Sequence, residues 1–227
     1  MGINEIFIYD DTFTVDRQRV LDICSTIQKR NLNIAWDIRA RVDTIDEEIL
    51  KALKKAGCRR IHYGVEGGTQ KILNILRKGI TLEQAEKAFK LTKKIGIETL
   101  GYFMIGNPTE TKEDVLATIN FAKKLNPDFV QITMTAPLPA TNLYKLALEE
   151  KVLSDDYMQK FAENPTADLK LRHWEKELSE KELNHLLNYA YRAFYWRPGY
   201  LIKELFGIHS MTELKRKLKA GLKILFR

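Results

Sequence analysis

Polar residues recur along this 227-residue sequence, each time directly after a short apolar run rich in β-forming residues. Each group taken alone has an ordinary explanation as a turn or a surface charge. In sheets of parallel strands, however, the carboxyl ends of the strands meet at one rim, where ligand sites gather. Together the groups predict a cleft with carboxylates, guanidinium groups and exposed backbone amides, suited to a zwitterionic ligand that carries hydroxyls and a heterocycle. The groups are Asp10-Asp11-Thr12, Arg39-Ala40-Arg41, Glu66-Gly67-Gly68, Gly106-Asn107-Pro108-Thr109-Glu110 and Ala136-Pro137-Leu138-Pro139.

No familiar catalytic motif accompanies this cleft. The sequence contains no H-E-x-x-H, no G-x-S-x-G and no phosphate-binding P-loop. His62 is the only histidine on a predicted strand, and it either faces the interior of the sheet or is an ordinary core or surface residue. Asp11 and Glu66 could also form a carboxylate pair for hydrolysis, which would require turnover without iron.

The elements that carry these groups alternate between strand and helix. The predicted strands are separated by segments with apolar residues at helical spacing, and the strand starts lie roughly 25 to 40 residues apart, as in right-handed βαβ units. The strands are 5–9, 34–38, 60–65, 99–105 and 129–134, and the helices are 16–29, 46–56, 70–77, 82–95, 112–125, 142–150 and 180–195, with one or two more over 200–227.

The fold class that follows is α/β, with about five parallel βα units in a partial (β/α) barrel and a C-terminal helical extension. A doubly wound sheet is the alternative, but the first βα turn has no glycine for a dinucleotide phosphate. Thr44, Thr81 and Ser179 fit N-caps of capping boxes, and Gly57 and Gly96 fit helix ends. We place a soft domain boundary near residue 152, giving a barrel over 1–152 and the extension over 153–227.

The charge distribution, hydropathy and cysteine content exclude several classes of protein. The net charge is +7, but +5 of it falls after residue 199, so a general nucleic-acid-binding surface is not indicated. The basic tail could contact RNA, acidic lipid or a partner, or pack as a helix with a solvated basic face. No segment is long and apolar enough for a membrane span or a signal peptide, and we expect a cytoplasmic protein. Cys24 and Cys58 form no C-x-x-C pair, and we expect both to be buried apolar residues.

An ordered series of short motifs resembles the radical S-adenosylmethionine (SAM) superfamily, in particular the branch whose members often carry a cobalamin-binding domain. The similarity covers about residues 3 to 150. The motifs are Glu5-Ile-Phe-Ile-Tyr-Asp-Asp-Thr-Phe-Thr14, Arg41-Val-Asp43, Ala56-Gly-Cys-Arg-Arg-Ile-His-Tyr-Gly-Val-Glu-Gly-Gly68, Arg77-Lys-Gly79, Phe103-Met-Ile-Gly-Asn-Pro-Thr-Glu-Thr111 and Ala136-Pro-Leu-Pro-Ala-Thr141. Each is weak alone, and the series in this order and spacing is specific.

The resemblance implies a partial (β/α)6 barrel and a role for each matching residue. Asp10, Asp11 and Thr12 would lie beside the methionine amino group of SAM, and Arg41 would approach its carboxylate. Glu66 would bond the ribose or methionine part, with Gly67 and Gly68 allowing the backbone to come close. The turn Gly106-Asn107 and the segment Pro137-Leu138 would flank the adenine, although Asn107-Pro108-Thr109 replaces the family's usual Pro-Gly pair.

The resemblance also implies a part that this sequence lacks. The family holds a 4Fe-4S cluster on a C-x3-C-x2-C loop after its first strand. Met1 stands directly before what corresponds to the second strand, so we expect the first strand, the cluster loop and any cobalamin domain to be missing.

The leading hypothesis is therefore a fragment of a radical SAM enzyme. The complete protein would cleave SAM reductively to a 5′-deoxyadenosyl radical, and methyl transfer with cobalamin is one reaction that the resemblance allows. The chain alone would be inert and would require the missing segment or a partner chain. The alternative is a SAM-binding or scaffold protein that kept the barrel without the chemistry.

Overall fold

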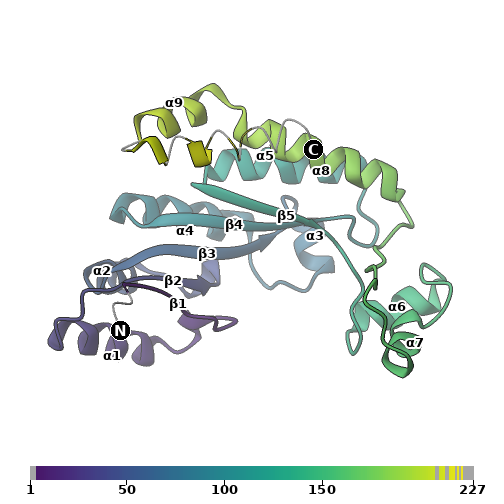
Figure 1. Ribbon diagram of the computed structural model, residues 1–227, viewed down its shortest axis with the longest axis horizontal. Coiled ribbons are helices and arrows are strands. Elements are labelled where there is room, and N and C mark those ends of the chain that lie inside the picture. Colours follow the sequence, from purple (N-terminus) through teal and green to yellow (C-terminus); the bar gives the residue numbers. More distant parts are fainter. Residues whose placement is uncertain (1–3, 208–209, 213–214, 218, 220, 222–227) are drawn as a thin grey trace. The chain divides into compact units, whose positions relative to one another are not determined.

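The computed structural model describes residues 4–207, 210–212, 215–217, 219 and 221. Five strands form one sheet in the order β1-β2-β3-β4-β5, and β1 to β4 pair in parallel with their neighbours (Figure 1). The strands are β1 (Glu5–Phe7), β2 (Ala35–Ala40), β3 (Cys58–Glu66), β4 (Glu98–Ile105) and β5 (Phe129–Met134). Strands in sequence order with helices between them confirm the predicted α/β class and the partial (β/α) barrel.

The described helices agree with the predicted spans to within two residues at most ends. One helix, α7, was not predicted, and the helix predicted from Tyr200 begins earlier, at Pro198. Most of the basic tail predicted as its continuation lies outside the described residues. The helices are α1 (Arg17–Lys29), α2 (Glu47–Lys55), α3 (Gln70–Ile75), α4 (Leu82–Ile95), α5 (Lys112–Leu125), α6 (Asn142–Glu149), α7 (Tyr157–Glu163), α8 (Glu180–Tyr195) and α9 (Pro198–Phe206), with the 3-10 turns η1 (Phe13–Val15) and η2 (Val42–Thr44).

The helix caps explain why these boundaries could be read from the sequence. The capping boxes of Thr81 with Gln84 and of Ser179 with Glu182 are both formed. The cap predicted at Thr44 is wrong, because the carboxylate of Asp46 accepts the N–H of Ile49 instead. Thr44 belongs to the preceding 3-10 turn, where its hydroxyl donates to the carbonyl of Arg41.

The chain divides into two compact units. Unit 1 comprises Met1–Phe103 and Leu116–Gln131, and unit 2 comprises Met104–Val115 and Ile132–Arg227. The boundary predicted near residue 152 stays a prediction.

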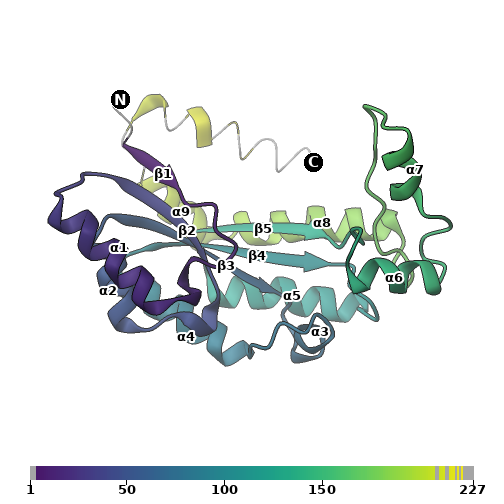
Figure 2. The same ribbon diagram turned by 90° about the horizontal axis from the view of Figure 1, so that it is seen from below.

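In unit 1, helices α1, α2 and α4 lie side by side along one face of the sheet (Figure 2). Alternate strand residues such as Trp36, Ile38, Ile61 and Tyr63 are fully buried. Side chains alternate between the two faces of a strand, so the residues between these belong to the opposite face. On β2 and β3 those intervening residues are polar or glycine: Asp37, Arg39, His62 and Gly64.

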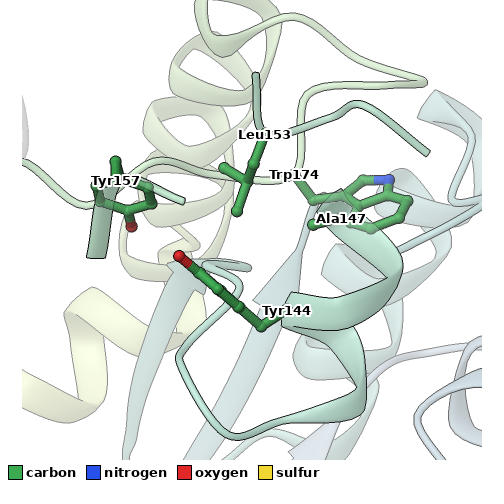
Figure 3. Close-up of a cluster of buried hydrophobic side chains, with 5 residues drawn as sticks. All are labelled: Tyr144, Ala147, Leu153, Tyr157 and Trp174. Atoms are coloured by element: carbon green, nitrogen blue, oxygen red, sulfur yellow. The ribbon is translucent and has the colours of Figure 1, made fainter. Parts of the chain in front are cut away.

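Unit 2 has a small apolar cluster of its own, which packs helices α6 and α7 (Figure 3). Five buried residues form it: Tyr144, Ala147, Leu153, Tyr157 and Trp174. The indole N–H of Trp174 donates to Glu177 at 2.7 Å, so the one polar atom of this large side chain is satisfied. Among the described helices of both units, none is long and apolar enough to cross a membrane.

Candidate functional site

A cavity of about 580 Å³ lies in unit 1 on the polar face of the sheet. Every strand contributes to its wall, as do the loops after β1, β2 and β3. The lining residues are Phe7, Tyr9, Asp11, Thr12, Asp37, Arg39, Ala40, Arg41, His62, Gly64, Glu66, Lys78, Tyr102 and Gln131. The cavity therefore extends from the carboxyl ends of the strands down to mid-strand positions.

Four of the predicted site residues meet in this cavity: Asp11, Thr12, Arg41 and Glu66. They come from three different βα units, and only the sheet topology brings them together. Asp10 does not line the cavity. Its carboxylate accepts a hydrogen bond from Arg19 at 2.7 Å, which holds the pKa of Asp10 below its usual value.

A local irregularity of β3 positions Glu66. The pairing of β3 with β4 shifts register between Gly64 and Glu66, and Glu66 has a φ of 73°, a left-handed backbone that residues with a side chain rarely adopt. Its carboxylate is 3.2 Å from the ammonium of Lys78. A Cβ on Gly64 would lie 2.5 Å from that carboxylate and 2.9 Å from the ammonium, so the glycine makes room for the pair. Burial raises the pKa of Glu66, and Lys78 opposes the shift.

Arg41 is held in place by groups outside the predicted ligand. Its Nε and one terminal nitrogen donate to the two carboxylate oxygens of Asp43 at 2.9 and 2.8 Å, and the terminal nitrogen also donates to the carbonyl of Lys78 at 3.0 Å. This bidentate pair orients the guanidinium toward the cavity wall.

The two glycines after Glu66 do not line the cavity. A Cβ on Gly67 would lie 2.7 Å from Ile72, and one on Gly68 would lie 2.3 Å from the Cα of Thr118 on α5. The N–H of Gly68 donates to the hydroxyl of Thr118 at 2.9 Å. The close approach predicted for Gly68 is therefore made to a helix.

The remaining predicted residues belong to unit 2, where Asn107 is the centre of a buried polar cluster. Asn107 and Glu110 are 1% and 0% exposed. One oxygen of Glu110 accepts both the backbone and the side-chain N–H of Asn107, and the Asn107 side-chain oxygen accepts the hydroxyl of Thr135. The other Glu110 oxygen has no partner among the described residues, and burial raises the pKa of Glu110 to about 7.

The turn around Asn107 is tight. Gly106 has a φ of 75°, and Thr109, at the end of the Asn-Pro-Thr sequence, has a φ of 58°. Thr109 thus adopts a left-handed conformation that glycine accepts at lower cost. Pro137 is buried and Leu138 is 47% exposed. That Gly106, Asn107, Pro137 and Leu138 flank the adenine stays a prediction.

Among the cavity residues that were not predicted as ligands, four polar side chains lie on strands β2 to β4: Asp37, Arg39, His62 and Tyr102. Asp37, His62 and Tyr102 sit at mid-strand positions, whereas Arg39 is the next-to-last residue of β2 and belongs to the predicted strand-end group Arg39-Ala40-Arg41. His62 Nδ1 is 2.9 Å from the Tyr102 hydroxyl, and His62 Nε2 is 3.8 Å from a carboxylate oxygen of Asp37. The signal for them was present, since polar residues at every second position of β2 and β3 interrupt otherwise apolar strands.

The protonation of His62 depends on its charged neighbours. Burial lowers its pKa, Asp37 opposes this, and Arg60 and Arg39 reinforce it. Replacing Asp37 by Asn should therefore lower the pKa of His62 further, and replacing Arg60 by Gln should raise it. An NMR titration of the imidazole protons checks both directions, and a rise in the Asp37→Asn variant would contradict this geometry.

Cys24 and Cys58 are 1% and 2% exposed, which confirms the prediction that both are buried. Burial raises the pKa of Cys24 to about 11 and raises that of Cys58 as well, so both thiols stay protonated at neutral pH. The described residues contain no group of three His, Cys, Asp or Glu side chains that could hold a metal ion. The donor set described in this structure therefore does not fit an iron-sulfur cluster.

Parallel βα units around a polar cavity that reaches the carboxyl ends of the strands define a ligand-binding βα barrel. A family model described as the radical SAM superfamily matches residues 1–122, more than half of the chain. The chain belongs to the radical SAM superfamily.

Among curated proteins, the chain is 39% identical over 228 residues to an uncharacterized methyltransferase of Pyrococcus horikoshii, covering 100% of this chain and 48% of that protein. It is 33% identical over 150 residues to an anaerobic magnesium-protoporphyrin IX monomethyl ester cyclase of Rubrivivax gelatinosus, covering 65% and 27%. The chain thus spans about half the length of the first relative and about a quarter of the second.

Among solved structures, the barrel is similar to a radical S-adenosylmethionine methyltransferase, TsrM, from Kitasatospora setae with cobalamin and a 4Fe-4S cluster bound. The TM-score is 0.61 at 22% identity, over 66% of this chain and 29% of that one. At this identity the similarity shows the fold.

Proposed function

We propose that this chain is a SAM-binding barrel of a radical SAM enzyme whose reaction is a methyl transfer, and that the complete enzyme uses a 4Fe-4S cluster and cobalamin. The observation that carries the proposal is the meeting of Asp11, Thr12, Arg41 and Glu66 at the strand ends of one cavity. Similarity to an uncharacterized methyltransferase over the whole chain supports the reaction type.

The residues at this end of the cavity fit the polar parts of SAM. The Asp11 carboxylate and the Thr12 hydroxyl suit an ammonium group, and the Arg41 guanidinium suits a carboxylate. Glu66 projects from a left-handed backbone beside a cation that favours its ionised form, and two carboxylate oxygens can accept from two ribose hydroxyls. Glycine at position 64 leaves the space beside it open.

When bound, SAM supplies an activated methyl group and, after reductive cleavage, radical chemistry. The described residues bind and orient it. Asp11, Arg41 and Glu66 hold the polar groups of the cofactor, and Phe7 on β1 and Tyr102 on β4 provide aromatic surface in the same cavity. We derive no redox step from these residues, because the described donor set does not fit a cluster.

Binding of radiolabelled SAM to the 227-residue chain by equilibrium dialysis tests the proposal. We expect saturable binding that Glu66→Gln weakens by roughly 10-fold or more, since a hydrogen bond to a charged group contributes about 1.5–3 kcal/mol. The matched control is Glu86→Gln, which removes an exposed carboxylate on α4 that pairs with Lys124. Absence of saturable binding, or equal weakening by both substitutions, would contradict the proposal.

A further inference from the structure

Arg39 stands apart from the other cations of the cavity. Arg41 is paired with Asp43, and Lys78 is paired with Glu66. Arg39 forms no ion pair with any residue in the part of the chain that the structure describes, although it is half-buried in the cavity wall. A guanidinium that lines a cavity and has no carboxylate partner is a position where an anionic ligand can pair with it.

Aromatic side chains surround Arg39. Its guanidinium carbon lies 4.1 Å from the ring centre of Tyr9 and 5.6 Å from that of Phe7. It also interacts with the side chain of Tyr102. The rings continue as a wall, with 5.1 Å between Phe7 and Tyr9, 5.0 Å between Phe7 and His62 and 5.8 Å between His62 and Tyr102.

This aromatic wall is accessible to a ligand. Phe7 is 36% and Tyr9 76% exposed, and both line the cavity. Stacked or edge-to-face contacts with such rings are favourable beyond the burial of apolar area alone. A planar aromatic group would cover these rings while its substituent reached the guanidinium.

The neighbouring anion does not satisfy Arg39. Asp37, two residues earlier on the same strand face, has Arg59 at 3.4 Å and Arg60 at 3.6 Å from its carboxylate oxygens. Those two arginines lie on the neighbouring strand and also pair with Glu5 and Glu98, and they, not Arg39, are the arginines within ion-pair distance of Asp37. The cation of Arg39 therefore remains available to one negative charge, and a ligand with two charges would meet Asp11, Asp37 and Glu66 in the same cavity.

We propose that the mid-strand end of the cavity is a binding subsite for an aromatic carboxylic acid, with its carboxylate on Arg39 and its ring against Phe7, Tyr9 and Tyr102. Arg39 lies in β2 and Arg41 follows the strand by one residue, so this subsite lies about 6.6 Å of extended chain below the residues assigned to SAM. That this ligand is the substrate rests on the proposed function. The binding itself does not, so its test uses the chain without cofactor or cluster.

The probe is benzoate, followed by ligand-observed NMR and by the Nε–H signal of Arg39, with benzamide as its uncharged counterpart. We expect benzoate to bind with a dissociation constant on the order of 1 mM, as suits a ligand of this size, and to shift the Arg39 signal. Benzamide should bind roughly 10-fold more weakly, since it lacks the charge that Arg39 pairs with.

Two substitutions separate the charge of Arg39 from its shape, and a third, at Arg30, is the control. Arg39→Gln should weaken benzoate binding by roughly 10-fold or more, and Arg39→Lys by about 3-fold, because lysine keeps the charge and loses the planar fork. Arg30→Gln removes an exposed arginine outside the cavity and should change nothing. Circular dichroism and thermal melting check that each variant is folded. If Arg39→Gln does not fold, the comparison of Arg39→Lys with the wild type still tests the role of Arg39.

A competition experiment tests whether Arg39 binds the carboxylate of a separate ligand or that of the cofactor. S-adenosylhomocysteine carries an amino-acid carboxylate, and it should leave benzoate bound. Displacement of benzoate by S-adenosylhomocysteine would show that Arg39 serves the cofactor, and would overturn the proposal. Failure of benzoate to bind, or binding that does not depend on Arg39, would also overturn it. The proposed function is tested separately through Glu66, so either can fail alone.

Discussion

Replacing Gly68 by alanine is expected to destabilise the protein by about 3 kcal/mol, the upper part of the range for overpacking a core. The new Cβ would lie 2.3 Å from the Cα of Thr118, 2.8 Å from its nitrogen and 2.8 Å from the carbonyl oxygen of Ala117. All three atoms are backbone atoms of α5, so no side-chain rotation relieves the clash. The N–H of Gly68 would also lose its hydrogen bond to the Thr118 hydroxyl as the loop moves away from α5.

Urea unfolding of the Gly68→Ala variant measures this loss. The matched control is Gly199→Ala on α9, where nothing lies within 4 Å of the added Cβ. Alanine there should be neutral or stabilising by up to about 1 kcal/mol, because it favours a helix over glycine. A Gly68→Ala variant as stable as the control would show that the loop after β3 does not make this contact with α5.

The second large effect concerns the pH dependence of stability, which Glu110 is expected to dominate in unit 2. Its pKa is raised from 4.5 to about 7 in the folded protein. A carboxyl group with a raised folded pKa favours the protonated folded state. Its contribution to stability is therefore present below about pH 4.5 and is lost as the pH rises to 7. A shift of this size corresponds to about 3 kcal/mol.

Glu110→Gln removes the ionisation and keeps an oxygen that can accept both N–H groups of Asn107. Between about pH 4.5 and 8, the stability of the variant relative to the wild type should rise by about 3 kcal/mol. Urea unfolding across this range provides the measurement, with Glu149→Gln on the surface of α6 as the control. A difference between variant and wild type that does not change with pH would mean that Glu110 ionises normally.

The fold could be predicted closely because its signals are local. Helix α4 begins and ends where its capping box and its left-handed Gly96 predict, and β5 has the predicted bounds. The start of α2 was harder because two residues competed for one cap, and the carboxylate of Asp46, directly before the helix, prevailed over Thr44. Helix α7 was missed because its stability comes from Tyr157 packing in the unit 2 cluster, a contact with residues distant in the sequence.

The candidate site was only partly predictable. Asp11, Arg41 and Glu66, which were predicted from strand ends, line one cavity because parallel strands bring their carboxyl ends to one rim. The same reasoning placed Arg39 at the rim but assigned it no ligand, because its distinction from Arg41 depends on side-chain contacts that the sequence does not show. The hydrogen bonds of Asn107 to Glu110 and Thr135 could not be predicted either. A polar residue directly after a strand can stabilise a turn or bind a ligand, and the sequence does not distinguish the two.

The division of the chain into two units places one buried tryptophan in each. Trp36 in unit 1 and Trp174 in unit 2 are both 1% exposed, and the third tryptophan, Trp196, is 43% exposed. The two buried indoles are held by different polar partners, the carbonyl of Ala56 and the carboxylate of Glu177. Each unit thus carries its own fluorophore in a distinct environment, and single-tryptophan variants can report the melting of one unit without labelling the protein.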